Sequence, residues 1–214
     1  MIGSGKDPRI KVLLHLDGDF VDARGHQVTT PNTYNNVWID GKFGKAADRG
    51  TGAINMRAVG ANVTQPSKFT VTAWHKRDGY TGLYIGEVCL CGIGGGWDGL
   101  SSSGIVITIV PNTKKTVFIF PKSIYEDYIS IKSTATITQG VWEQYALTFD
   151  GETFRWYQNG SKIAEYTPSN IQDIFIYRGD ILRFNYFRNA DEIMFADDLL
   201  IEGDTYDVPQ EPYK

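Results

Sequence analysis

Short apolar segments with a two-residue period recur along the whole chain, and they constrain the fold more than any other feature. FTVTAWHK at 69–76 and EQYALTF at 143–149 alternate in the way that places every second side chain on one face of a β-strand. No segment carries a sustained helical stripe of apolar residues, so the sequence favours strands over helices. The predicted strands cover residues 9–16, 69–76, 82–91, 104–110, 115–120, 143–149, 153–158, 180–187 and 191–201.

Turn dipeptides separate these segments. Asn-Gly and Asp-Gly tolerate the left-handed backbone of tight hairpin turns. Asn159-Gly160, between FRWYQ and SKIAEY, is the clearest predicted hairpin. Many short strands joined by such turns indicate an all-β sandwich or barrel. Asp-Gly pairs occur at 17–18, 40–41, 78–79, 98–99 and 150–151.

The chain reads as one domain followed by a short tail. Its 214 residues are 42% hydrophobic and 13% aromatic, which is enough for a substantial core, and no proline- or serine-rich linker divides them. We place the domain at residues 1–203 and the tail, DTYDVPQEPYK, at 204–214. The tail holds few apolar residues and two prolines, so we expect it to lie along the surface or to reach a partner. Its deletion is then expected to leave the fold intact and to weaken assembly.

Charge and hydropathy argue against two classes of partner. The net charge is −4, and no basic run exceeds Lys114–Lys115, which excludes a typical nucleic-acid surface. The N-terminal MIGSGKDPRIK lacks the apolar core of a secretion signal, and every apolar stretch is too short to span a bilayer. We therefore expect a soluble protein that is made in the cytoplasm and does not insert into membranes.

Several segments, taken in order, resemble the laminin-G-like, or concanavalin A-like, jelly roll. The resemblance implies a two-sheet antiparallel sandwich over nearly the whole chain. Gln144 stands where the family usually has a histidine, so the role of that histidine does not carry over. The ending, in which VPQEPY follows an Asp-Asp-Leu strand, resembles domains of bacteriophage virion proteins. The matching segments are LLHLDGDFVDARGH (13–26), GKFGKAAD (41–48), FTVTAWHKR (69–77), VWEQYALTFDGETFRWYQNGSKIAE (141–165) and ADDLLIEG (196–203).

An acidic cluster, Asp17, Asp19 and Asp22, follows the first predicted strand. The resemblance makes the first and last strands neighbours, which would bring Asp17 close to Asp198. Carboxylates from two strands, with turn carbonyls, can supply the oxygens that Ca²⁺ needs, and we predict these four aspartates as its ligands. The spacing is not that of an EF-hand. The alternative is that the aspartates cap turns by accepting hydrogen bonds from backbone amides.

The motifs of common hydrolases are missing from the sequence. Carbohydrases of related fold commonly use Glu-x-Asp-x-x-Glu on one strand, and no such segment occurs. There is no Gly-x-Ser-x-Gly elbow, and the glycine run GIGGGWDG at 92–99 lacks the Gly-Lys-Ser/Thr ending of a phosphate loop. We predict no catalytic residues and expect that the protein is not an enzyme.

The same glycine run indicates a carbohydrate-facing loop. Trp97 has few large neighbours to bury its indole, and Asp98 beside it offers an acceptor for sugar hydroxyls. The alternative is that Trp97 folds back as a lid on the sandwich edge. Further candidates for this carbohydrate-binding surface are Tyr80, Tyr84, Tyr125 and Tyr128.

These observations support two main functional hypotheses. The first is a non-catalytic virion protein that decorates a phage particle or adsorbs it to host glycans, with other virion proteins as partners and a symmetric homo-oligomer as its form. The second is a carbohydrate-binding module of a bacterial surface or secreted system, which would be extracellular. A hydrolase with an unrecognised site is a third. Turnover of a polysaccharide would establish that third reading.

Overall fold

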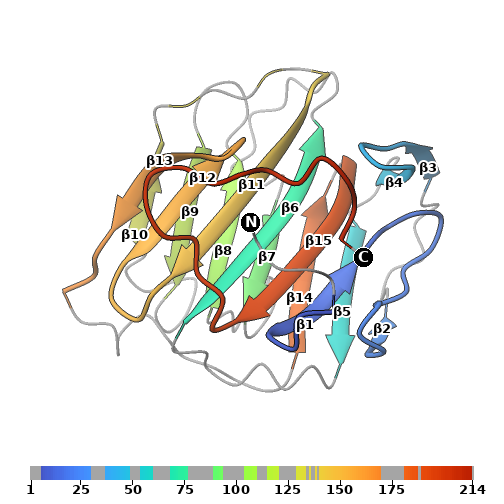
Figure 1. Cartoon of the computed structure of the whole chain (residues 1–214), viewed down its shortest axis with the longest axis horizontal. Coiled ribbons are helices and arrows are strands. Elements are labelled where there is room, and N and C mark those ends of the chain that lie inside the picture. Colours follow the sequence, from blue (N-terminus) through green and yellow to red (C-terminus); the bar gives the residue numbers. More distant parts are fainter. Residues whose placement is uncertain are drawn as a thin grey trace.

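The computed structural model shows two antiparallel β-sheets stacked face to face (Figure 1). This confirms the prediction of an all-β jelly-roll sandwich. No helix occurs among the residues that the structure describes, and so none there could cross a membrane. The described residues are 6–29, 37–48, 54–59, 68–76, 89–93, 104–109, 115–120, 129–133, 135, 138, 140–169, 181–187 and 189–213.

The front sheet has eight strands, in the order β13-β12-β11-β6-β15-β4-β3, with β1 also paired to β15. The first and last strands are therefore neighbours, as the resemblance implied. The strands are β1 (Ile10–Leu14), β3 (Val37–Asp40), β4 (Lys45–Asp48), β6 (Phe69–Lys76), β11 (Trp142–Phe149), β12 (Phe154–Gln158), β13 (Ser161–Tyr166) and β15 (Asn189–Asp197).

The second sheet lies behind the front sheet in Figure 1 and has the order β10-β9-β8-β7-β14-β5-β2. The chain passes between the two sheets more than once, as when β5 in the second sheet is followed by β6 in the front sheet, and runs such as β7–β10 stay within one sheet. The strands are β2 (Gln27–Thr29), β5 (Ile54–Val59), β7 (Cys89–Ile93), β8 (Gly104–Ile109), β9 (Lys115–Phe120), β10 (Ile129–Lys132) and β14 (Ile181–Phe187).

Aromatic side chains fill the inner face of the front sheet. Phe149 and Phe154 stack with ring centroids 4.2 Å apart, and Phe69 stacks on Phe195 at 5.9 Å. All four rings are buried, as is Trp156. Because side chains alternate along a strand, the two-residue period seen in the sequence places these rings on one face.

The outer face of the front sheet is covered by the end of the chain, residues 198–213, which we call the strap. It appears as the dark red tube that crosses this face in Figure 1. We predicted a strand up to residue 201, but β15 ends at Asp197 because Asp198 adopts a left-handed φ of 53°. The strap side chains Leu199, Ile201, Tyr206 and Tyr213 pack on Ile10, Leu13, Ala146, Tyr157, Met194 and Ala196 of the sheet.

Hydrogen bonds fasten the strap to the β12–β13 hairpin. The Tyr206 amide donates to the Gly160 carbonyl at 2.8 Å, and the Tyr206 hydroxyl donates to Gln144 Oε1. The Tyr157 hydroxyl donates to the Gly203 carbonyl at 2.7 Å. Gly160 has a φ of +81°, and a Cβ there would lie 2.4 Å from the Tyr206 carbonyl oxygen, so only glycine fits. The tail thus packs on the sheet as a layer of the fold, and in contrast to the expectation from the sequence we now expect its deletion to weaken the fold.

Candidate functional site

A pocket of about 560 Å³ opens where the loop after β1 meets the end of the strap. We call it the loop pocket. Val21 is the most exposed large hydrophobic residue that the structure describes, at 64%, and it lies in the pocket wall. Apolar groups and polar groups therefore share one concave surface, as in small-molecule sites generally. The lining residues are His15, Asp17, Asp19, Val21, Ala23, Pro212 and Tyr213.

Asp22 gives the loop its shape. Its side chain is buried, and its Oδ1 accepts hydrogen bonds from the amides of Leu13 at 2.9 Å and Arg24 at 3.0 Å. Its Oδ2 lies 2.5 Å from His26 Nδ1. These contacts are the turn chemistry that we considered as the alternative to calcium.

Asp17 and Asp19 are the two predicted residues that reach the pocket. Asp17 Oδ1 accepts from the Lys45 amide at 2.7 Å, and Asp19 Oδ1 accepts from the Val21 amide at 3.1 Å. One oxygen of each carboxylate is held by the backbone in this way. The geometry of the acidic loop is therefore fixed before any ligand arrives.

The predicted proximity of Asp17 and Asp198 is wrong. β1 runs antiparallel to β15, with Leu14 opposite Ile193 and Ile10 opposite Ala196. Asp17 therefore lies beyond one end of β1 and Asp198 beyond the other. No group of three or more His, Cys, Asp or Glu side chains suited to a metal occurs in the described part of the chain. Asp198 therefore does not join Asp17, Asp19 and Asp22, and calcium binding stays a prediction.

Glu192 connects the strap to the loop pocket. The pairing of β15 with β6 shifts register between Asp191 and Ile193, and Glu192 there has a φ of 32°. Its buried Oε2 accepts from the Tyr213 amide at 2.9 Å and lies 3.0 Å from His15 Nδ1. The hydrogen bond to Glu192 raises the pKa of His15. Because His15 Nδ1 is hydrogen-bonded to Glu192, Nε2 is the ring nitrogen that remains to contact a ligand.

Asp191 anchors the turn between β3 and β4. Its buried Oδ2 accepts from the amides of Lys42 at 2.5 Å and Phe43 at 2.9 Å. A Cβ on Gly41 would lie 2.5 Å from the same oxygen, so the turn approaches the carboxylate closely. Burial raises the pKa of Asp191 from 3.8 to about 6.

Asp191→Asn is expected to stabilise the fold at pH 8 by about 1–3 kcal/mol. A raised folded-state pKa contributes stability that is fully present below pH 3.8 and is lost as the pH rises through about 6. Asparagine keeps the acceptor oxygen without the charge, so the gain should vanish near pH 4. Urea unfolding at both pH values measures the change in the free energy of unfolding, and Asp207→Asn, at an exposed strap residue, is the control. An equal gain at both pH values would contradict this assignment.

The remaining predicted site residues lie outside the described residues. They are Trp97, Asp98, Tyr80, Tyr84, Tyr125 and Tyr128. The sequence did not indicate His15, Glu192, Pro212 or Tyr213 as site residues. No spacing signal could have joined them, since His15 and Glu192 are 177 residues apart.

Known proteins share this sequence pattern and fold. Residues 48–180 match the family model of the concanavalin A-like lectin/glucanases superfamily. Domain 4 of AbnA, a GH43 extracellular arabinanase from Geobacillus stearothermophilus in complex with arabinotriose, superposes with a TM-score of 0.66 at 17% identity, covering 90% of this chain and 94% of that one. The Ruminococcus gnavus IT-sialidase CBM40 bound to α2,3-sialyllactose gives 0.56 at 14%, covering 83% and 95%.

The same fold occurs within a larger enzyme. Trypanosoma rangeli sialidase in complex with the inhibitor DANA gives a TM-score of 0.57 at 13% identity, covering 89% of this chain but 31% of that one. No curated protein sequence matches the chain. Identities this low show the fold alone, whereas the family match extends over more than half of the 214 residues. The chain belongs to the concanavalin A-like lectin/glucanases superfamily.

Proposed function

We propose that the protein is a non-catalytic carbohydrate-binding module that holds a neutral glycan in the loop pocket. The observation that carries this proposal is the composition of that pocket. Val21, Ala23 and Pro212 offer apolar surface to the C–H faces of a sugar, while His15, Asp17 and Asp19 offer polar atoms to its hydroxyls. A sugar ring presents both kinds of surface.

The polar groups are held in place by the fold. The amides of Lys45 and Val21 each occupy one oxygen of an aspartate, which leaves the second oxygen of Asp17 and Asp19 to accept from a hydroxyl. Glu192 orients His15 in the same way. Groups that are ordered in advance lose less entropy when a ligand binds.

The charges around the pocket favour a neutral sugar over an acidic one. Among the residues that the structure describes, its lining contains two aspartates and neither lysine nor arginine. Buried Asp191 and Glu192 lie behind His15 and act on it electrostatically. An anionic sugar would therefore meet like charges, and its carboxylate would find no permanent cation in the pocket wall.

Two of the similar structures support carbohydrate binding in general, because one holds arabinotriose and the other holds sialyllactose, and only the first of these sugars is neutral. They favour our second hypothesis, a module of a bacterial surface or secreted system, over a virion component. Extracellular action belongs to the same proposal. A phage context and assembly with virion proteins stay predictions.

Isothermal titration with neutral trisaccharides, namely arabinotriose, xylotriose, mannotriose and cellotriose, tests the proposal, with α2,3-sialyllactose as the anionic comparator. We expect at least one neutral sugar to bind more tightly than sialyllactose. Asp19→Ala should weaken that binding about tenfold, the loss of one charged hydrogen bond, without lowering the melting temperature. Asp207→Ala, an exposed strap carboxylate outside the pocket, is the matched control. Failure of all four sugars to bind would overturn the proposal.

A further inference from the structure

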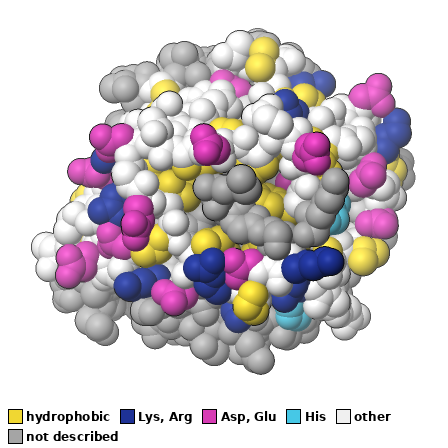
Figure 2. All heavy atoms as spheres, viewed as in Figure 1, with side chains coloured by type: hydrophobic (Ala, Val, Ile, Leu, Met, Phe, Trp, Pro, Cys, Tyr) yellow, Lys and Arg dark blue, Asp and Glu magenta, His cyan; other side chains and the backbone are white. Residues whose placement is uncertain are grey.

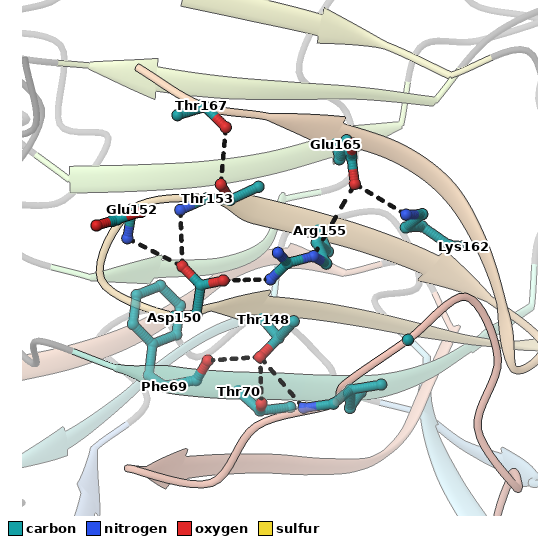
Figure 3. Close-up of polar contacts among 12 residues, drawn as sticks. Phe69, Thr70, Thr148, Asp150, Glu152, Thr153, Arg155, Lys162, Glu165 and Thr167 are labelled. Carbon is teal, nitrogen blue, oxygen red and sulfur yellow. Dashed lines mark hydrogen bonds and ion pairs between the residues drawn. The ribbon is translucent and has the colours of Figure 1, made fainter. Parts of the chain in front are cut away.

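A second pocket of about 330 Å³ lies at the other end of the strap, against the β12–β13 hairpin. We call it the hairpin pocket. Its walls come from the β11–β12 turn, from β12 and β13, and from the strap. Figure 3 shows the lining residues Asp150, Arg155, Lys162 and Glu165. In Figure 2, acidic and basic side chains gather around the margin of this face, and hydrophobic side chains lie nearer its middle. The lining residues are Asp150, Arg155, Lys162, Glu165, Leu200, Ile201, Glu202 and Gly203.

Asp150 fixes one side of the hairpin pocket. Its Oδ1 accepts hydrogen bonds from the amides of Glu152 at 2.9 Å and Thr153 at 2.8 Å. Its Oδ2 accepts from Arg155 Nη1 at 2.5 Å (Figure 3). The guanidinium is therefore held in one orientation, and it keeps further N–H donors for a ligand.

Glu165 and Lys162 form the opposite side. Lys162 Nζ lies 2.8 Å from Glu165 Oε2 and 2.7 Å from Asp204 Oδ1, and Arg155 Nε lies 3.9 Å from the same Glu165 oxygen. Donors and acceptors thus alternate around the pocket. The strap is also hydrogen-bonded to β11 beside this pocket, because the Ile201 amide donates to Thr148 Oγ1 at 3.4 Å.

The charged groups of the hairpin pocket favour a neutral ligand with hydroxyl groups over an anion. In the described part of its wall, three carboxylates, from Asp150, Glu165 and Glu202, line the pocket against two cations, and each cation already contacts a carboxylate. An anion would gain little from cations that are already neutralised. A sugar hydroxyl both donates and accepts, so it can join an alternating array without adding charge. Leu200 provides apolar surface in the same wall.

We propose that the hairpin pocket is a second binding site for a neutral saccharide, an inference that rests on the proposed function of the loop pocket. The strap forms a wall of both sites, with Leu200–Gly203 at one and Pro212–Tyr213 at the other. In the front sheet, β12, β11, β6 and β15 separate β13 from β1, a span of roughly 25 Å. The two pockets together would bind a polymeric or clustered glycan more tightly than either alone.

Titration of the full chain with the same four neutral trisaccharides, followed by calorimetry and by amide chemical shifts, tests this second site. We expect two sites per chain, with shifts in residues 150–165 and 200–203 as well as in 15–23. Glu165→Ala, at a side chain that is 53% exposed, should abolish the first set of shifts and leave the second. Arg155→Lys should weaken the same site, since lysine cannot reproduce the guanidinium fork. Glu152→Ala is the control outside the lining.

The outcomes separate the two proposals. One site per chain, with shifts at 15–23 alone, would overturn the second site and leave the loop pocket standing. If the amide chemical-shift changes at the hairpin pocket persist in Asp19→Ala, they support the second site independently of the loop pocket. If no trisaccharide of the four binds, both proposals fail.

Discussion

Deleting residues 204–214 is expected to lower the free energy of unfolding by about 3–6 kcal/mol. The deletion removes Tyr206 and Tyr213, and it uncovers Leu13, Tyr157 and Met194 on the outer face of the front sheet. Loss of one large buried side chain costs about 3–5 kcal/mol. Tyr213 is buried, whereas Tyr206 is only partly buried and adds a smaller loss. Urea unfolding followed by circular dichroism measures the loss as a lower midpoint.

The matched control for this deletion keeps the strap and changes its exposed residues. Asp207→Ala with Gln210→Ala leaves both tyrosines in place and should change stability by less than about 0.5 kcal/mol. If the truncated chain unfolded at the same urea concentration as the full chain, the strap would be a dispensable tail, as its composition first indicated. The structure argues otherwise because few apolar residues suffice when they are tyrosines that face an apolar sheet.

Asp22→Ala is expected to destabilise the fold by about 2–4 kcal/mol. The substitution leaves the amides of Leu13 and Arg24 without their acceptor, and Asp22 itself is only 2% exposed. A buried donor without a partner costs more than the mean value of a hydrogen bond, since it lost its water on folding. Urea unfolding at neutral pH measures the effect.

Asp19→Ala is the matched control for Asp22, because it lies three residues away in the same acidic loop and is exposed. It should change stability by less than about 0.5 kcal/mol while weakening sugar binding. Equal stability of the two variants would show that the Asp22 carboxylate does not hold the loop. Comparison of the two variants therefore distinguishes Asp22, which shapes the loop, from Asp19, which lines the loop pocket.

The strands were predictable wherever the apolar period was long and regular. Predicted segments 69–76 and 143–149 correspond to β6 (Phe69–Lys76) and β11 (Trp142–Phe149). The Asn159-Gly160 turn is confirmed, with φ of 48° and 81°. β3 and β4 are four residues each, too short to show a period. The family resemblance covered β4 within residues 41–48, and no sequence feature indicated β3.

The candidate site was predictable only in part. Asp17 and Asp19 stood out because they follow an apolar strand, and both line the loop pocket. Glu192 did not, because it follows Asp191 at the start of the predicted strand 191–201, and neighbours in a regular strand lie on opposite faces. The irregularity in β15 buries both side chains and aims Glu192 at the strap. A bulge depends on pairing with distant strands, which local sequence does not encode.

A crystal structure of the protein with the tightest-binding neutral trisaccharide tests the central claim most directly. We expect a sugar ring against Val21 and Pro212, with hydroxyls hydrogen-bonded to Asp17 and Asp19. A sugar bound only against Trp97 and Asp98, with the loop pocket empty, would contradict it.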